Sequence, residues 1–187
     1  FDKDHNTFTI IYPGALSKLR GVEDAINVVG HYEGKVKLIL AGTWGSQSFK
    51  KYCKQLSGWK YVKYIGRVSP KKIYSYMKTS DLGIHLIHDI PTSRIGYPVK
   101  AFEFMACGLP FLMSDVGNKK ELFHDVCEFI KPGDIKNIKS KIDYLINNKE
   151  KRIELGNKGR KKVIENYNLD FEVKKLVKLY DVVLNKS

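Results

Sequence analysis

Short apolar runs alternate with amphipathic segments along most of this chain, and that alternation limits what it can fold into. The apolar runs have strand length and several end in glycine, whereas the segments between them show helical spacing. This order is typical of successive βαβ units around a parallel sheet. The expected strands are residues 7–12, 35–41, 61–65, 81–87, 110–113 and 128–130, and the expected helices between them are 20–31, 46–56, 70–78 and 99–107.

From Asp134 onward only helical spacing remains. It predicts helices over residues 135–146, 153–167 and 171–184, which pack on the sheet faces or extend as a closing tail. No internal repeat, low-complexity tract or long linker divides the chain, so we expect one domain. The predicted fold class is therefore α/β, a doubly wound parallel sheet of about six strands with helices on both faces and C-terminal helices.

Composition excludes two other classes of chain. The 187 residues are 43% apolar and 12% aromatic, enough for one sizeable core or two small ones, and this argues against intrinsic disorder. No apolar run approaches the roughly 20 residues that cross a bilayer. The first residue is Phe rather than Met and a strand follows almost at once, which suggests an excised piece of a longer protein.

The cysteines and histidines give no metal-ligand pattern. Cys53, Cys107 and Cys127 are widely spaced and lack a C-x-x-C pair, so a reducing, cytoplasmic compartment fits best. His85 and His88 lie three residues apart at the end of an expected strand, which leaves a zinc site open as the minor alternative. We expect no metal and no cofactor.

The net charge is strongly positive. Lys and Arg number 33 against 20 Asp and Glu, which gives +13 at pH 7. Such a charge attracts polyanions, anionic lipid surfaces or phosphorylated ligands, and does not choose among them. Where lysines crowd one helix, as in residues 158–162, a solvated helix face is the simpler interpretation.

Three glycines follow apolar strands, at Gly14, Gly42 and Gly66. The carboxyl ends of parallel strands form the ligand crevice of an open α/β sheet, and glycine lets a backbone approach a ligand closely. Ordinary strand-to-helix turns explain each glycine equally well. Neither G-x-G-x-x-G nor G-x-x-x-x-G-K-[ST] occurs, which argues against a dinucleotide fingerprint and a P-loop.

The most informative segment is residues 94–110, which read R-I-G-Y-P-V-K-A-F-E-F-M-A-C-G-L-P. A loop at Gly96 opens directly into a helix, whose free N–H groups and dipole attract phosphate. Lys100 and Glu103 lie three apart and share a helix face, so a cation and a carboxylate can address one ligand. From spacing alone, a simple surface ion pair is the slightly favoured alternative.

This segment belongs to an ordered set of motifs. The others are residues 12–21 (Y-P-G-A-L-S-K-L-R-G), 64–68 (Y-I-G-R-V), 114–118 (S-D-V-G-N), Glu121, 132–134 (P-G-D), 166–168 (N-Y-N) and 176–184. Together they resemble the donor-binding, C-terminal half of family 4 glycosyltransferases with the Rossmann-like GT-B fold. The resemblance covers essentially residues 1–187 as one donor-binding domain and implies an N-terminal acceptor domain outside this chain.

The resemblance also implies roles for particular residues. Glu103 matches the glutamate that hydrogen-bonds the ribose hydroxyls, and Arg20 occupies the basic position that neutralises the diphosphate. The remaining implied positions are Gly14 beside the diphosphate, Gly66, Arg67 and Val68 beside the base, and Gly96, Tyr97 and Pro98 beside the β-phosphate and the transferred sugar.

Two positions depart from the family pattern. Ile95 stands where the family often carries the first of two glutamates, and Ala15 stands where an arginine is expected. The pattern P-x-K-x-F-E-[FY]-M-A-x-G resembles a variant branch, in which Lys100 supplies the missing positive charge.

The resemblance implies a retaining, metal-independent transfer of a sugar from a UDP- or GDP-sugar to a glycan or lipid-linked acceptor, as in polysaccharide biosynthesis. The isolated half is expected to turn over little, and the basic charge is compatible with peripheral attachment to the inner face of a membrane. Rival interpretations are a GT-B sugar-nucleotide epimerase, a degenerate transferase and a polyanion-binding module; on the favoured interpretation we expect no nucleic-acid partner.

Overall fold

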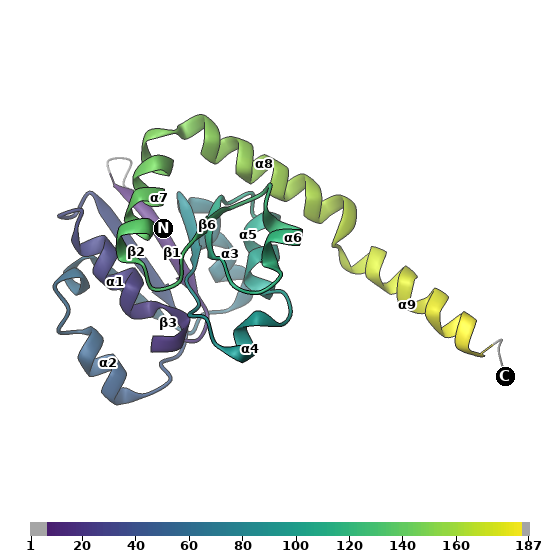
Figure 1. The fold of residues 1–187 in the computed structure, drawn as a ribbon, viewed down its shortest axis with the longest axis horizontal. Helices are drawn as coiled ribbons and strands as arrows, with labels where there is room; N and C mark the ends of the chain where they lie inside the picture. Colours follow the sequence, from purple (N-terminus) through teal and green to yellow (C-terminus); the bar gives the residue numbers. More distant parts are fainter. Residues whose placement is uncertain (1–6, 185–187) are drawn as a thin grey trace.

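The protein is described by a computed structural model over residues 7–184. Within these residues six strands form one parallel sheet in the order β3-β2-β1-β4-β5-β6 (Figure 1). The strands are β1 (Phe8–Pro13), β2 (Val36–Ala41), β3 (Val62–Gly66), β4 (Leu82–His85), β5 (Phe111–Ser114) and β6 (Glu128–Ile130). The predicted α/β class and the parallel sheet are confirmed.

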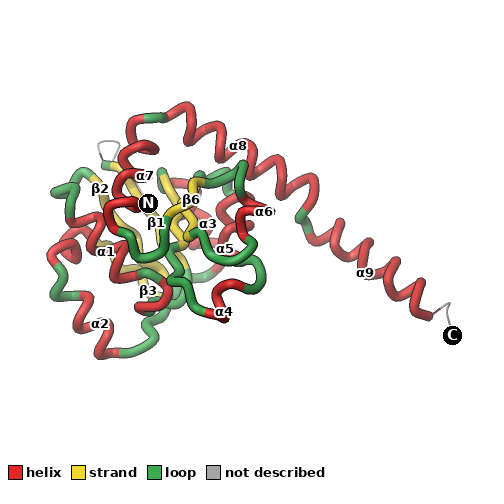
Figure 2. The backbone as a smooth tube through the Cα atoms, in the orientation of Figure 1, coloured by secondary structure: helices red, strands yellow, loops and turns green. Residues whose placement is uncertain are grey.

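Helices cover both faces of the sheet, as Figure 2 shows. They are η1 (Lys18–Arg20), α1 (Val22–Gly30), α2 (Gln47–Cys53), η2 (Ser57–Tyr61), α3 (Pro70–Thr79), α4 (Pro91–Arg94), α5 (Val99–Ala106), α6 (Lys119–Phe123), α7 (Ile135–Asn147), α8 (Lys149–Asn166) and α9 (Leu169–Leu184). One core cluster joins α1 and α7 to the sheet, and the other joins α3, α5 and α6 to the opposite face. Alternate strand residues serve the two clusters because successive side chains point to opposite faces.

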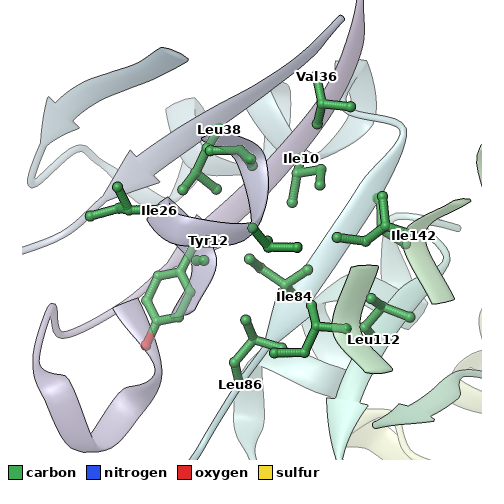
Figure 3. Packing of buried hydrophobic residues seen from close by; sticks show 14 of the residues in the cluster. Ile10, Tyr12, Ile26, Val36, Leu38, Ile84, Leu86, Leu112 and Ile142 are labelled. Atoms are coloured by element: carbon green, nitrogen blue, oxygen red, sulfur yellow. The ribbon is translucent and has the colours of Figure 1, made fainter. Parts of the chain in front are cut away.

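Tyr12 lies at the margin of the first cluster. Figure 3 shows it at the edge of the group that contains Ile10 and Ile84, with the hydroxyl directed away from them. The hydroxyl donates to the backbone carbonyl of Arg20 at 3.0 Å. The end of β1 and the loop through η1 are therefore held together by one buried side chain.

Two short helices were not expected. No helix was expected over residues 91–94, but α4 forms there, where the buried Ser93 hydroxyl lies 2.9 Å from the carbonyl oxygen of His88 and 2.8 Å from that of Ile90 and donates a hydrogen bond to these acceptors. Helix α6 begins at Lys119, a buried lysine whose Nζ donates to the carbonyls of Ser93 and Val116. These bonds join the two segments, and a periodicity search cannot detect them.

Strand β4 is shorter than expected. The apolar run over residues 81–87 predicts a longer strand, yet β4 ends at His85. The chain then turns toward the η1 loop, where the N–H of His88 donates to the carbonyl of Leu19 at 2.9 Å. This connection brings the end of β4 beside the loop that follows β1.

Helix α9 projects away from the body of the domain (Figure 1), and its residues are exposed throughout. Of the two arrangements that the sequence left open for the last helix, it adopts the extended one. Among the described residues, no helix combines the length and the apolar character that crossing a membrane requires.

Gly83 sets how closely α5 approaches the sheet. A Cβ built on Gly83 would lie 2.7 Å from the ring of Phe104, which is fully buried and cannot move aside without disturbing the core. We predict that Gly83→Ala lowers the free energy of unfolding by about 1–3 kcal/mol, measured by urea denaturation. Gly45→Ala is the matched control, because its Cβ would meet only ordinary contacts from 3.5 Å. Equal stability of the two variants would contradict this packing.

Candidate functional site

A cavity of about 520 Å³ opens at the carboxyl ends of the strands. It lies where the strand order reverses between β1 and β4, the position at which open α/β sheets bind ligands. The polar side chains that line it are those of Arg20, Arg67, Tyr74, His85, Lys100 and Glu103. Four cations or potential cations and one carboxylate therefore face one space, from elements far apart in the sequence.

Backbone, not side chains, forms one wall of this cavity. The N–H of Gly14 donates to the carbonyl of Ala41, and the N–H of Gly42 donates to the carbonyl of Gly66, each at 2.8 Å. Gly42 has a φ of +148°, and a Cβ there would lie 1.8 Å from the carbonyl oxygen of Gly14. The loops after β1, β2 and β3 are consequently packed backbone to backbone, and position 42 has no room for a side chain.

Arg20 is carried by the loop that Tyr12 anchors. Burial raises the pKa of Tyr12, with Arg20 opposing, so the phenol keeps its proton and remains a donor to that loop. The Arg20 side chain is exposed and lines the cavity. Its position therefore depends on a buried neutral hydrogen bond to its own carbonyl.

Lys100 occupies an unusual environment for a lysine. Its stem is only half-buried, but its Nζ is enclosed and has no hydrogen-bond partner among the described residues. The Nζ lies 4.3 Å from the centre of the Tyr12 ring and 3.0 Å from where a Cβ on Gly14 would stand. Burial, and secondarily the charge of Arg20, lower the pKa of Lys100 to about 7, while Glu103 opposes the shift.

Glu103 lies one turn further along α5 and is half-buried at the cavity wall. The surface ion pair with Lys100 that spacing alone favoured is not formed within the described part of the chain. Burial and the Glu103 carboxylate raise the pKa of the neighbouring Tyr74, so its hydroxyl stays protonated beside the carboxylate. Glu103 and Lys100 thus both line the cavity, and the Lys100 Nζ lies covered at its wall.

His85 is a cavity residue that the sequence analysis did not assign to this site. It ends β4 with 4% of its surface exposed. Burial, then the charges of Lys100, Lys119 and Arg20, lower the pKa of His85 to about 3, so its imidazole is neutral at neutral pH. A histidine at the end of a buried apolar strand was the available signal, and it was considered only for zinc.

The zinc alternative receives no geometric support. The Nε2 of His88 is 2.6 Å from an Asp24 carboxylate oxygen, so the two histidines have different surroundings. Across residues 7–184 no group of three or more His, Cys, Asp or Glu side chains is arranged to hold a metal ion.

The cavity brings together seven of the residues to which the resemblance gave a role: Gly14, Arg20, Arg67, Val68, Pro98, Lys100 and Glu103. Gly66, Gly96 and Tyr97 lie outside its wall. Gly66 supports Gly42 through its carbonyl, Gly96 has a φ of +76° with open space around it, and the Tyr97 ring packs edge-on against Phe123 at 5.9 Å. The roles implied for all ten residues remain predictions.

The fold and cavity define a class: a doubly wound α/β domain with a basic ligand cleft at its topological switch point. A model of the family described as glycosyl transferases group 1 matches residues 1–162. The chain belongs to this family, which confirms the resemblance seen in its motifs.

Two curated relatives are similar over most of this chain, and both are uncharacterized glycosyltransferases of Methanocaldococcus jannaschii. One is 25% identical over 180 residues, which cover 94% of this chain and 45% of the relative. The other is 27% identical over 155 residues, which cover 80% of this chain and 41% of the relative. The chain therefore spans less than half the length of the curated relatives it matches.

Solved structures share the fold. HepE of Anabaena, in complex with UDP and glucose, superposes with a TM-score of 0.84 at 20% identity, covering 95% of this chain and 49% of that one. Sucrose-phosphate synthase of Thermosynechococcus elongatus superposes with a TM-score of 0.85 at 18% identity, covering 100% of this chain and 47% of that one. The C-terminal domain of LpcC from Francisella tularensis gives 0.74 at 20% identity and covers 87% of both chains. These similarities confirm a GT-B half-structure.

The Lys100 environment predicts how stability depends on pH. The pKa of Lys100 is about 7 in the fold against 10.5 for a free lysine, so between these values the unfolded chain binds more protons and stability rises with pH. Below about pH 7 the charge is buried without a partner. We predict that Lys100→Met stabilises the fold by about 1–4 kcal/mol at pH 6, and that this gain shrinks toward pH 10.

Urea denaturation at several pH values measures this difference. Lys161→Met, at an exposed position on α8, is the control and should leave stability nearly unchanged at every pH. A Lys100→Met variant that is less stable than the parent at pH 6 would show that the amine is well paired in the fold.

Proposed function

We propose that this chain is the donor-binding half of a retaining, metal-independent glycosyltransferase that transfers a sugar from a UDP- or GDP-sugar to a glycan or lipid-linked acceptor. The observation that carries the proposal is the Lys100 Nζ, enclosed at the cavity without a hydrogen-bond partner and one helical turn from the Glu103 carboxylate. A diphosphate linked to a ribose offers an anion to the first group and hydroxyl donors to the second.

The diphosphate is the group that the cations fit best. Arg20 and Lys100 line the cavity from η1 and α5, and the Lys100 Nζ lies beside the Gly14 backbone. The N-terminus of α5 adds the positive end of its dipole, because Pro98 and Val99 at that end also line the cavity. Fixed donors of this kind stabilise the negative charge that develops on a departing diphosphate, which is the role we assign to Arg20 and Lys100.

Because Arg20 and Lys100 are built into the cavity wall, we propose that transfer needs neither a metal ion nor a further cofactor. The nucleotide sugar is the donor substrate, with its ribose on Glu103 and its base beside Arg67 and Val68. HepE, which shares the fold, was solved with UDP and with UDP-glucose, and this supports a uridine or similar nucleotide as the donor carrier. The retaining outcome rests on the family resemblance.

The acceptor site is assigned to an N-terminal half. This chain spans less than half of its curated relatives, which supports the proposal that groups outside it bind the acceptor. A net charge of +13 fits work at an anionic membrane surface on the cytoplasmic side, where each Lys or Arg near the lipid contributes about 1 kcal/mol.

Glu103→Gln tests the ribose contact. Loss of charge-assisted hydrogen bonds to the ribose hydroxyls should raise the dissociation constant of UDP or GDP about tenfold to a hundredfold, measured by isothermal titration calorimetry. The effect should largely disappear with a 2′,3′-dideoxy nucleotide, which has no hydroxyl donors to lose.

Glu165→Gln, on the exposed surface of α8, is the matched control and should bind like the parent. Unchanged affinity for UDP and GDP in Glu103→Gln, or an equal loss with the dideoxy nucleotide, would remove Glu103 from the ribose site.

The two-domain account predicts a separation of binding from turnover. This chain alone should bind the nucleotide, yet transfer sugar at least about a hundredfold more slowly than a protein that also carries the N-terminal half, because the acceptor is not held near the donor. Release of the nucleotide from its sugar, with and without acceptor, measures this difference. Vigorous transfer by the chain alone would contradict the assignment of the acceptor site.

A further inference from the structure

The Lys100 amine has no anionic hydrogen-bond partner within the described part of the fold. Its Nζ is enclosed, makes no hydrogen bond with any described residue and faces the aromatic ring of Tyr12 at 4.3 Å. That ring gives a cation only weak compensation relative to a carboxylate or phosphate. An ammonium held in such a place, with Arg20 nearby, is driven toward the neutral amine.

The groups around Lys100 reinforce this tendency. The other charged or titratable groups on the cavity wall are Arg20 of η1, Arg67 after β3, Tyr74 of α3, His85 of β4 and Glu103 of α5. Glu103 is the only acid among them and the single group whose charge favours the ammonium. The wall is therefore poor in negative charge before any ligand binds.

We propose that the cleft binds a nucleoside diphosphate together with one proton, which the Lys100 amine takes from solvent to become the ammonium that pairs with the phosphates. The inference rests on the proposed function and deepens it. The diphosphate supplies the negative charge that the wall lacks, so above about pH 7 the charged form of Lys100 becomes favourable only when the ligand is present. The pKa of about 7 in the fold is consistent with this behaviour.

His85 is the rival proton acceptor in the same cavity. Its imidazole has the surrounding cations Lys100, Lys119 and Arg20, and its pKa of about 3 lies far below that of Lys100. To be protonated at neutral pH, Lys100 needs a much smaller rise in its pKa from a bound diphosphate than His85 does. Lys100 therefore takes the proton, and His85 stays neutral and offers one ring N–H to the ligand.

Proton uptake is measured by titrating UDP, and separately GDP, into the chain at pH 8.0 in two buffers of different ionisation enthalpy. The terminal phosphate of a free nucleoside diphosphate titrates near pH 6, so it contributes little at this pH. We expect binding enthalpies that differ between the buffers by the heat of nearly one proton. The dissociation constant should rise toward tenfold per pH unit between about pH 7.5 and 9.

Three variants locate the proton. Lys100→Arg keeps a permanent cation and should bind UDP with no uptake, because arginine does not titrate in this range. His85→Gln should keep the uptake with weaker binding. Lys161→Gln, at an exposed lysine of α8, should match the parent in both. Loss of uptake in His85→Gln, with retention in Lys100→Arg, would overturn the proposal.

If a variant fails to fold, the titrations of the parent chain with UDP and GDP still test the proposal. Binding of UDP or GDP with equal enthalpy in both buffers and no dependence on pH would overturn proton uptake while leaving the proposed function intact. Absence of binding by both nucleotides would remove the proposed function, and the inference with it.

Discussion

The structure of the cleft depends on one buried amine that has no anionic partner of its own. The Lys100 Nζ is enclosed under the backbone of Gly14 and against the Tyr12 ring. This placement lowers the stability of the fold near neutral pH and gives a diphosphate a site that is already desolvated and shaped. A surface lysine would attract the same anion less strongly, because water would screen its charge.

The sheet topology explains why so many distant segments reach this amine. The order β3-β2-β1-β4-β5-β6 reverses between β1 and β4, so the connections after these strands diverge and leave a crevice. Tyr12 ties the loop after β1 to the carbonyl of Arg20, and the N–H of His88 ties the chain after β4 to Leu19. The two hydrogen bonds thus fix η1 to the ends of β1 and β4, and α5 lines the crevice with Lys100.

Sequence periodicity predicted the strands and long helices because their apolar spacing is strong. It did not detect α4 or α6, since both are short and depend on the buried polar contacts of Ser93 and Lys119 with distant carbonyls. The same limit applies to the site. The order of the motifs singled out Arg20 and Glu103, and both residues line one cavity in the structure. The enclosure of the Lys100 Nζ and the presence of His85 in that cavity depend on packing that no local sequence pattern records.

The most direct test of this account is a crystal structure of the chain with UDP or GDP bound. It predicts a phosphate oxygen within about 2.7–3.2 Å of the Lys100 Nζ and ribose hydroxyls against the Glu103 carboxylate. A nucleotide bound elsewhere, or one in the cleft whose phosphates leave the Lys100 Nζ without a contact, would contradict it.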